Sequence, residues 1–493
     1  MEENNIQKKV IQATKWSTIT EVAAKLVAPI TNMVLARVLT PEAFGVVATI
    51  TMVISFAEMF ADSGFQKYLV QHEFKNEKEK FENANVAFWT NLSISIILWL
   101  IIFIFREDIA TLVGNPGLGM VLAIASLELP MTSFSSIQMA LYRRDFDFKT
   151  LFIVRIFSII IPFIVTIPLA LLGLNYWALI IGNLCKQLSN AIILTLKSKW
   201  KPQLYYSVEK LKEMFSFSAW SLIEAISIWL TSWVGTFIIG TILNQYYLGI
   251  YKTSVSLVNA LMGLVTSALV PVLFSSLSRL QNDNRKFSSF YFQFQRAVSI
   301  LIFPLGVGVF LYSDLATKIM LGDQWAEASS VIGHWALTSS IMIVIGYFST
   351  EVYRAKGRPK LSFLAQMLHL IVLVPTIYYS AKHSFGTLII ARSWIRMQFV
   401  LVHLIILKFA IGLSIRKILN NVLPTFIVSI VMGIFGYFLK QLYSGIIWDI
   451  ISIFLCVIFY FAILLAVPTL RNEIKFLFMK FAPEKLLNKV ASK

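Results

Sequence analysis

Long apolar segments alternate with short charged connections along the whole chain. Several of them, such as 84–105 and 361–381, contain no Asp, Glu, Lys or Arg. Because a helix needs about 20 apolar residues to cross the hydrocarbon core of a bilayer, the pattern predicts an all-α membrane protein with fourteen transmembrane helices. The segments lie at roughly 16–36, 44–70, 84–105, 109–130, 151–173, 176–196, 217–243, 248–274, 290–312, 328–350, 361–381, 386–408, 418–439 and 447–468.

Positive charge is distributed unevenly between alternate connections. Counted with the segment ends that adjoin them, the connections on one side of the segments carry 31 Lys and Arg residues, whereas those on the other side carry five. Cytoplasmic loops of membrane proteins carry an excess of Lys and Arg. The asymmetry therefore predicts that the N- and C-termini are cytoplasmic, as an even number of spans requires.

The connections are too short to hold a separate domain outside the membrane. The longest, such as 197–216, run to about twenty residues. They carry most of the net charge of +17, and their Lys and Arg side chains would face anionic lipid headgroups. Membrane lipids are thus the expected partners of these charges, and nucleic acid is not. Both cysteines lie inside apolar segments, so no disulfide framework is expected.

Parts of the chain repeat after 204 residues. Trp16 matches Trp220 and Gly45 matches Gly249 in this register. Chance similarity among apolar helices is the alternative explanation, but six helices separate the two copies, so both run in the same direction through the bilayer. That arrangement is typical of transporters built from two parallel halves.

The repeat predicts the domain organisation. Residues 1–200 would form an N-terminal lobe of six helices and residues 201–412 a second lobe of six. Residues 413–493 would add two helices and a cytoplasmic tail. The substrate site would then lie between the two lobes.

Three stretches carry a family resemblance. Residues 35–71, "LARVLTPEAFGVVATITMVISFAEMFADSGFQKYLVQ", are similar to the opening of the polysaccharide-transporter (PST) branch of the MOP flippase superfamily. Residues 141–151, "LYRRDFDFKTL", and 353–363, "YRAKGRPKLSF", resemble the basic loops after that family's fourth and tenth helices. The branch includes Wzx-type lipopolysaccharide flippases and the colanic-acid and teichuronic-acid exporters.

The resemblance implies that the protein is a flippase of the bacterial cytoplasmic (inner) membrane and that it is not an enzyme. Its cargo would be an oligosaccharide repeat unit on undecaprenyl diphosphate, moved from the cytoplasmic to the outer leaflet for O-antigen, capsule or exopolysaccharide biosynthesis. Two lobes in a V shape, as in MATE-type transporters, would open alternately to each side. No cofactor is implied, but coupling to a proton or sodium gradient is expected. The working form would be a monomer. Glycosyltransferases, which make the cargo, and a polysaccharide polymerase, which uses it after transport, would be its partners.

Six cations inside the apolar segments are the candidate substrate-binding residues. An ionised side chain at mid-bilayer costs about 2.5–3.5 kcal/mol on insertion scales, so such residues persist where they face water or a partner. We expect them to line a central cavity and to neutralise the diphosphate or acidic sugars of the cargo. Lys25, Lys186 and Arg396 fall near the midplane, Arg392 lies one turn nearer the outer face, and Arg155 and Arg296 lie nearer the cytoplasmic end.

The partners of these cations are left open by the sequence. Arg392 and Arg396 share one helix face, and their segment contains no acid. They would face either a substrate anion, which suits the planar guanidinium, or carboxylates on other helices. Lys25 follows Glu21 by one turn, so the two would either pair with each other or face the cavity separately.

Lys186 lies on a polar helix face together with Asn183, Gln187 and Asn190. A polar stripe at this depth of an apolar segment favours cavity lining over packing between helices.

The acids of the apolar segments are candidates for ion coupling or for counter-ions. Glu58 and Asp62 share a helix face, an arrangement that suits proton coupling. Bridges from these two acids to Arg155, Arg296 or loop cations are the preferred interpretation. The candidates are Glu21, Glu58, Asp62 and Glu224, and Glu128 is a further acid in the fourth segment.

Pro29 lies mid-segment, where a proline removes a backbone hydrogen bond and kinks a helix. It is the candidate hinge for alternating access. Three histidines, His334, His369 and His403, lie on separate segments without metal-ligand spacing and are expected to pack between helices. No metal site is predicted.

Two other functions fit the pattern less well. An ion-coupled multidrug exporter commonly carries cations, so its cavity would be expected to be anionic. The number of Lys and Arg residues near the membrane midplane argues against such a cavity. A polysaccharide ligase or polymerase would need a substantial outer loop with catalytic Arg or His. The longest outer loop, 313–327, contains only Asp314, Lys318, Asp323 and Glu327 as charged residues, so no catalytic residue is assigned.

Overall fold

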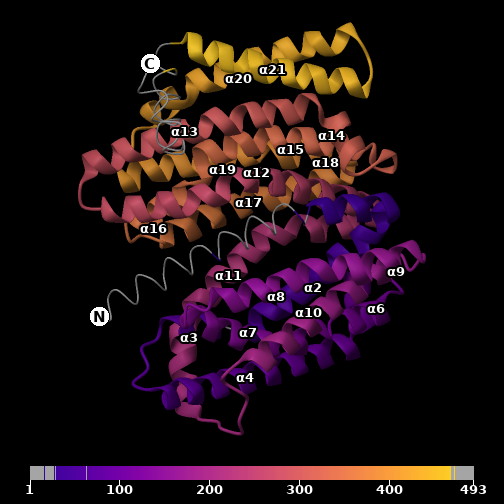
Figure 1. The fold of residues 1–493 in the computed structure, drawn as a ribbon, viewed down its shortest axis with the longest axis vertical. Coiled ribbons are helices and arrows are strands. Elements are labelled where there is room, and N and C mark those ends of the chain that lie inside the picture. The colour runs from indigo at the N-terminus through magenta and orange to yellow at the C-terminus, as the bar shows by residue number, and fades with distance from the viewer. Residues whose placement is uncertain (1–15, 17–26, 28, 63, 468–470, 472–493) are drawn as a thin grey trace. The chain divides into compact units, whose positions relative to one another are not determined.

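The computed structural model describes residues 16, 27, 29–62, 64–467 and 471 of the chain. Within these ranges all regular structure is helical and no strand occurs (Figure 1), which confirms the predicted all-α class. Residues 29–38 are helical, and the helices that follow are α2 (Pro41–Asp62), α3 (Phe65–Gln71), α4 (Glu77–Ile104), α5 (Arg106–Leu112), α6 (Gly119–Ala125), α7 (Glu128–Arg144), α8 (Phe148–Ile161), η1 (Pro162–Thr166), α9 (Ile167–Leu171), α10 (Tyr176–Lys197), α11 (Val208–Ile242), α12 (Gln245–Arg279), α13 (Asn284–Leu311), α14 (Ser313–Met320), η2 (Asp323–Trp325), α15 (Ala328–Met342), η3 (Ile343–Tyr347), α16 (Ser349–Ala355), α17 (Lys360–His383), α18 (Phe385–Trp394), α19 (Arg396–Ile406), η4 (Leu407–Ile411), α20 (Ile415–Leu442) and α21 (Ile446–Ala466).

Thirteen helical segments among the described residues are long and apolar enough to cross a membrane. They correspond one to one to the second to fourteenth apolar segments of the sequence. The expected first segment, 16–36, lies largely outside the described residues, so the count of fourteen stays a prediction.

One predicted segment was misplaced. The apolar run 109–130 was expected to form the fourth span, but the helical span covers Gly119–Arg144. The run is interrupted because Gly114 and Gly117 adopt left-handed φ values of 81° and 82°, a conformation that glycine adopts at little cost. The span then continues through Ser- and Gln-containing sequence that hydropathy alone would not include.

By packing, the chain divides into two units. Of the described residues, the first contains those up to 253 together with 320–325 and 377–385, and the second contains 254–319, 326–376 and those from 386 onward. In the first unit α10 packs on α7 and α8, α4 packs on α7, and α11 packs on α2; in the second, α13 packs on α15 and α20, and α20 packs on α21. These units group residues by contact, whereas the predicted lobes follow the repeat, so the lobe boundaries stay a prediction.

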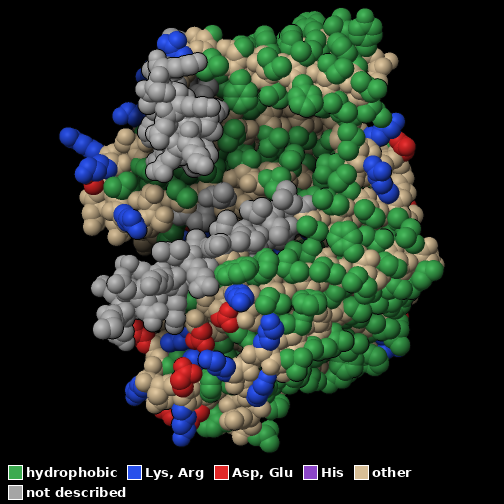
Figure 2. All heavy atoms as spheres, in the orientation of Figure 1, with side chains coloured by type: hydrophobic (Ala, Val, Ile, Leu, Met, Phe, Trp, Pro, Cys, Tyr) green, Lys and Arg blue, Asp and Glu red, His purple; other side chains and the backbone are tan. Residues whose placement is uncertain are grey.

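Both units have broad apolar surfaces. Figure 2 shows hydrophobic side chains over much of α20 and α21 in the second unit and over α8 and α10 in the first. Leu188, Ile192 and Leu196 of α10 are exposed, as are Phe454 and Ile458 of α21. Exposed apolar surfaces of this extent are expected where helices face lipid.

The repeat has a structural counterpart inside the first unit. A Cβ on Gly45 would lie 1.9 Å from the backbone oxygen of Gln245, and a Cβ on Gly249 would lie 1.8 Å from that of Pro41. Pro41 and Gln245 are themselves 204 residues apart. The contact between α2 and α12 is therefore reciprocal, and it requires glycine at both repeat-related positions.

Candidate functional site

A cavity of about 510 Å³ lies within the first unit, between α2, α4, α7 and α11. α2 contributes the carboxylates of Glu58 and Asp62, and α11 contributes the rings of Trp229 and Trp233. α4 contributes the amide of Asn91 and the hydroxyl of Ser95, and α7 contributes the hydroxyls of Thr132 and Ser136. The cavity therefore combines two aromatic faces with hydrogen-bonding groups inside membrane-spanning helices.

The two tryptophans are one helical turn apart, so they lie on the same face of α11. The indole Nε1–H of Trp229 donates to Ser55 Oγ at 3.0 Å, and its ring packs on Phe56 with centroids 4.8 Å apart. Lys252 Nζ lies 3.5 Å from the ring centroid of Trp233. Both rings are thus held by side chains of neighbouring helices.

The two carboxylates of the cavity have different surroundings. Glu58 Oε1 accepts a hydrogen bond from Thr132 Oγ1 at 3.2 Å. Asp62 Oδ1 is buried and has no hydrogen-bond partner among the described residues. The first carboxylate is therefore positioned from α7, and the second accepts hydrogen bonds from Gln66 of α3.

Behind Glu58 a hydrogen-bonded network links α7 and α10. Gln187 Nε2 donates to Glu128 Oε1 at 2.9 Å and to Thr132 Oγ1 at 3.2 Å. Lys186 lies close enough to interact electrostatically with both Glu58 and Glu128. The network thus joins the acid that lines the cavity to the polar stripe of α10.

The polar groups on α4 and α7 are also oriented. Ser133 Oγ donates to Asn91 Oδ1 at 2.7 Å, and Asn91 Nδ2 donates to Ser136 Oγ at 3.3 Å. Ser133 Oγ also lies 2.9 Å from Ser95 Oγ. The amide of Asn91 is therefore fixed before any ligand arrives.

The polar stripe predicted on α10 is bonded within the first unit. Lys186 Nζ donates to Asn183 Oδ1 at 3.4 Å. Asn190 Nδ2 donates to Gln187 Oε1 at 3.3 Å and its own Oδ1 accepts from Ser158 Oγ of α8 at 2.7 Å. Whether Lys186 also meets a substrate stays a prediction.

In the second unit Arg392 and Arg396 flank one aromatic ring. Their guanidinium carbons lie 5.0 Å and 4.2 Å from the ring centroid of Trp335. Arg396 Nη1 donates to Ser339 Oγ at 2.7 Å, while Arg392 Nε is buried and has no hydrogen-bond partner among the described residues. Trp335 is fixed in turn by Asn259, whose Oδ1 accepts from its Nε1 at 3.2 Å.

The two other described cations differ in their environment. Arg296 of α13 donates from Nε and Nη2 to Asn421 Oδ1 of α20 at 2.9 Å and 2.7 Å. Arg155 of α8 is exposed. Arg155 and Lys186 belong to the first unit and Arg296, Arg392 and Arg396 to the second, so a cavity shared by all of them stays a prediction.

Several of the predicted site residues lie outside the described part of the chain. Glu21 and Lys25 are outside the described residues, and the side chain of Glu224 is not described either. Pro29 is half-buried at the start of the helical stretch 29–38, and its role as a hinge stays a prediction. Among the described residues no group of three or more His, Cys, Asp or Glu side chains could hold a metal ion.

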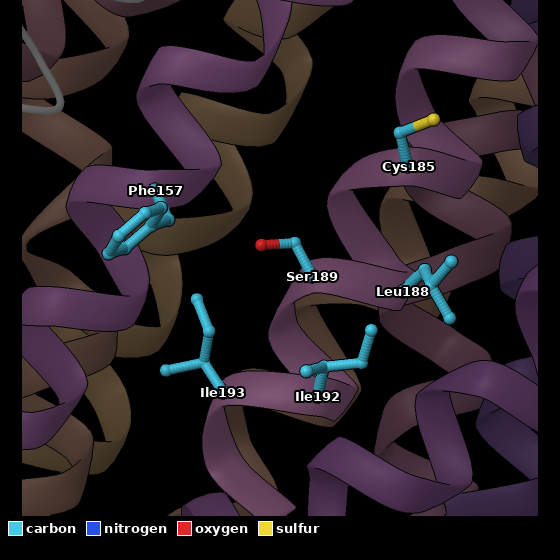
Figure 3. Close-up of a pocket in the computed structure, with 6 residues that line it drawn as sticks. All are labelled: Phe157, Cys185, Leu188, Ser189, Ile192 and Ile193. Carbon is cyan, nitrogen blue, oxygen red and sulfur yellow. The ribbon is translucent and has the colours of Figure 1, made fainter. Parts of the chain in front are cut away.

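A second cavity of about 400 Å³ lies between α8 and α10. Figure 3 shows Phe157 of α8 across from Ser189 and Ile193 of α10. Its described lining contains no charged side chain, so it is a groove of the apolar surface and holds none of the candidate site residues.

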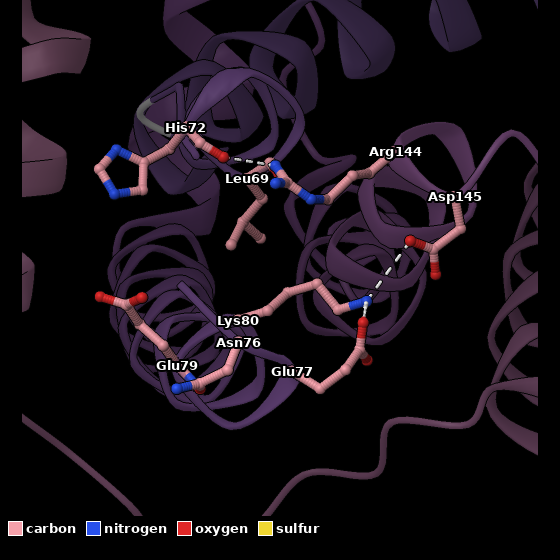
Figure 4. A network of polar contacts seen from close by, with 8 residues as sticks. All are labelled: Leu69, His72, Asn76, Glu77, Glu79, Lys80, Arg144 and Asp145. Carbon is pink, nitrogen blue, oxygen red and sulfur yellow. Dashed lines mark hydrogen bonds and ion pairs between the residues drawn. The ribbon is translucent and has the colours of Figure 1, made fainter. Parts of the chain in front are cut away.

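Two basic residues organise the end of the first unit where α3, α4 and α7 meet (Figure 4). Arg144 Nη1 donates to the backbone oxygens of Leu69 at 3.0 Å and His72 at 2.5 Å, at the end of α3. Lys80 Nζ lies 2.8 Å from Glu77 Oε1 and 3.4 Å from Asp145 Oδ1. Arg144, from the family stretch 141–151, and Lys80 thus connect the ends of α3, α4 and α7.

The sequence analysis missed the aromatic part of the cavity. Trp229 and Trp233 had a recognisable signal, since two tryptophans four residues apart in an apolar segment share a helix face. Their role was not predicted because a tryptophan in such a segment equally suits lipid contact or packing. Asn91 was missed because its segment is otherwise strongly apolar.

The comparisons with known proteins agree with the sequence-based resemblance. A family model described as "Polysaccharide biosynthesis protein" matches residues 34–330. The chain belongs to this family. It is 25% identical over 390 residues to the succinoglycan biosynthesis transport protein ExoT of Rhizobium meliloti, covering 79% of this chain and 77% of that protein. It is 21% identical over 452 residues to the lipopolysaccharide biosynthesis protein WzxC of Escherichia coli, covering 87% and 89%.

Solved structures share the fold. The lipid II flippase MurJ in an inward closed conformation superposes with a TM-score of 0.75 at 14% identity, covering 94% of this chain and 99% of that one. An inward-facing multidrug resistance MATE transporter of the MOP superfamily has a TM-score of 0.63 at 13% identity, covering 80% and 98%. The chain therefore has the all-α fold of membrane transporters of this superfamily.

Proposed function

We propose that this protein is a flippase for an oligosaccharide repeat unit linked to a polyprenyl diphosphate. It would carry the unit from the cytoplasmic to the outer leaflet during biosynthesis of a surface polysaccharide. Family membership supports the class of process, because the relatives include proteins named for succinoglycan transport and for lipopolysaccharide biosynthesis. We infer transport rather than catalysis, since the relatives' names include a transport protein and a flippase.

The observation that carries the proposal is the cavity between α2, α4, α7 and α11. Polar and ionisable side chains inside membrane-spanning helices are costly unless they face water, a partner or a cargo. Here Glu58, Asp62 and Asn91 line an open space instead of a closed helix interface. A hydrophilic cargo that must cross the bilayer provides the physical reason for such a space.

The finer features are proposals of the same kind. We infer location in the bacterial cytoplasmic membrane with both termini cytoplasmic, supported by the asymmetry of Lys and Arg between alternate connections. With this orientation α2 ends in the cytoplasmic half, so the cavity at Glu58 and Asp62 would receive cargo from the cytoplasmic leaflet. Undecaprenyl diphosphate as the carrier, a monomeric working form, and glycosyltransferases and a polymerase as partners follow from the family resemblance.

The mechanism would be alternating access of two lobes around this cargo. The candidate cations Lys25, Lys186, Arg392 and Arg396 would neutralise the diphosphate during passage. A proton or sodium gradient would drive the cycle, and the network from Glu58 to Glu128 is the described group best suited to couple to it.

A second candidate function has one observation in its favour. Two carboxylates and two tryptophans in one cavity are also suited to an organic cation, through charge attraction and cation–π contacts. This would describe a multidrug exporter of the MOP superfamily. Family membership favours the oligosaccharide flippase. The deletion experiment below distinguishes the two functions.

The test is deletion and complementation in cells that make a surface polysaccharide by this route. Deletion should remove the surface polymer and leave the lipid-linked repeat unit accumulated in the membrane, while sensitivity to cationic drugs stays the same. Wild-type protein should restore the polymer. Unchanged polymer together with increased sensitivity to cationic drugs would support the exporter and reject the flippase.

A further inference from the structure

We propose that the cavity between α2, α4, α7 and α11 binds the sugar part of the cargo, and that it accepts neutral or amino sugars and rejects acidic ones. This inference rests on the proposed function and extends it to the chemistry of the transported repeat unit. It assigns the diphosphate to a different part of the transporter. The argument follows from the aromatic faces, the hydrogen-bonding groups and the charges of the lining.

The aromatic faces suit a pyranose ring. A sugar ring has apolar C–H faces, which pack on aromatic rings, and hydroxyl groups at its edge. Trp229 is held in place at its Nε1 by Ser55 and on one side by Phe56. A platform that is already immobilised loses little conformational entropy when a ligand stacks on it.

The hydrogen-bonding groups line the same cavity as this platform. Glu58, Asp62 and Asn91 present acceptors and an amide to the same cavity. The carboxylate of Asp62 lines the cavity and accepts hydrogen bonds from the side chain and the backbone of Gln66, and a hydroxyl of the sugar would add a further donor to this group. Hydrogen bonds from hydroxyl groups to carboxylates are stronger than those between neutral groups.

The size of the cavity fits a small part of an oligosaccharide. Its volume of about 510 Å³ lies within the range of roughly 300–1,000 Å³ that is usual for small-molecule sites. One or two sugar residues of a repeat unit would therefore occupy it, and the remainder of the cargo would extend beyond it.

The charges of the lining determine which sugars are accepted. Glu58 and Asp62 are the only charged side chains among the described lining residues. A uronic acid or a diphosphate in this cavity would place a third negative charge beside them, which is unfavourable in a site of low dielectric constant. The ammonium of an amino sugar would be attracted. Four described cations lie near the lining without being part of it: Lys186 near Glu58, Lys67 and Arg143 near Asp62, and Lys252 beside the ring of Trp233.

The experiment measures protection of a cysteine placed in the cavity. Ser232 is an exposed lining residue whose hydroxyl donates to Ile228 of its own helix. The Ser232→Cys variant, in a background with Cys185→Ala and Cys456→Ala, would be purified in lipid nanodiscs and treated with a water-soluble methanethiosulfonate reagent. The rate of modification would be followed with N,N′-diacetylchitobiose, chitobiose, digalacturonic acid or tetraphenylphosphonium present.

The expected result is slower modification with the neutral and the amino disaccharide, and an unchanged rate with digalacturonic acid. Trp229→Ala should raise the half-protecting sugar concentration by about tenfold, the equivalent of ~1.4 kcal/mol. Trp394→Ala is the matched control, because Trp394 is an exposed tryptophan outside the lining. In the double variant Glu58→Gln/Asp62→Asn, digalacturonic acid should gain protection while the neutral disaccharide still protects.

Two outcomes would overturn the inference. Equal protection of the unsubstituted cavity by the acidic and the neutral disaccharide would remove the charge selection. Protection by tetraphenylphosphonium and by no sugar would remove the sugar site altogether. Either result would leave the flippase proposal standing if the deletion strain still loses its polymer, whereas an unaffected deletion strain would reject the flippase itself.

Discussion

Trp229 and Ser55 are joined by a hydrogen bond between α11 and α2, with Nε1 of the indole 3.0 Å from Oγ of the serine. The bond connects helices 174 residues apart in the sequence. Because the ring of Trp229 lines the cavity, the serine acts as a positioning residue for the aromatic platform.

Replacing Ser55 is expected to impair transport without lowering the amount of folded protein in the membrane. Ser55→Ala leaves the indole N–H without its acceptor, and a lost hydrogen bond of about 1 kcal/mol corresponds to roughly fivefold. Export of the surface polymer, normalised to the amount of protein in the membrane, should fall by about that factor. Thr241→Ala on α11 is the control, since its hydroxyl is exposed and bonds only to its own helix; equal export by both variants would contradict the positioning role.

The reciprocal contact of Gly45 and Gly249 predicts a loss of stability on adding a methyl group. Gly249→Ala would place a Cβ 1.8 Å from the backbone oxygen of Pro41, and overpacking of this kind costs about 1–3 kcal/mol or more. The variant should show less folded protein and a lower melting temperature in detergent. Gly308→Ala in α13 is the control, because nothing lies within 4 Å of its added Cβ. A wild-type melting temperature for Gly249→Ala would show that the helices separate at no cost.

Arg144 is expected to stabilise the end of the first unit. Its guanidinium donates to backbone oxygens that end α3 and lies over the ring of Phe74 at 4.5 Å. Hydrogen bonds to charged groups contribute about 1.5–3 kcal/mol, so Arg144→Ala should lower the melting temperature in detergent by several degrees. The neighbouring Arg143 is exposed, and among the described residues it makes one hydrogen bond, to Gln66 at 3.4 Å. An equal effect of Arg143→Ala would mean that net charge matters and the backbone contacts do not.

Replacing Arg396 tests most directly whether a cation near the membrane midplane contacts the cargo. If its guanidinium contacts the cargo, Arg396→Ala should lower export by about thirtyfold at normal protein level, the equivalent of ~2 kcal/mol for a desolvated cationic contact. If its contacts with Trp335 and Ser339 only hold the helices together, the amount of folded protein should fall instead. Lys382→Ala, which removes an exposed cation, is the control. Normal export at normal protein level would remove Arg396 from the site.

The spans were predictable because a run of apolar residues is a local property of the sequence. The fourth span was misplaced for the same reason, since left-handed glycines interrupt the helix within the apolar run and hydrogen-bonded serines continue the span beyond it. The family was predictable from residues 35–71. Part of that motif has a structural basis, because the backbone oxygens of Ala36 and Leu39 accept hydrogen bonds from Gln324 at 2.6 Å and 3.0 Å.

The site was predictable only in part. Glu58 and Asp62 were recognisable because an acid in an apolar segment is unusual whatever its neighbours. Thr132 and Ser55, which position Glu58 and Trp229, come from distant segments and carry no local signal. Candidate cations were recognised in the same way as the acids, but their assignment to one cavity depends on tertiary structure and stays a prediction.

The most direct test of the proposed function is flipping by the purified protein. Proteoliposomes would be prepared with the polyprenyl-diphosphate-linked repeat unit in both leaflets, and a glycosidase added outside would cleave every accessible headgroup. We predict that cleavage proceeds beyond the outer half to near completion when the protein and its driving gradient are present. Cleavage that stops at the outer half, in vesicles shown to contain folded protein under both proton and sodium gradients, would contradict the account.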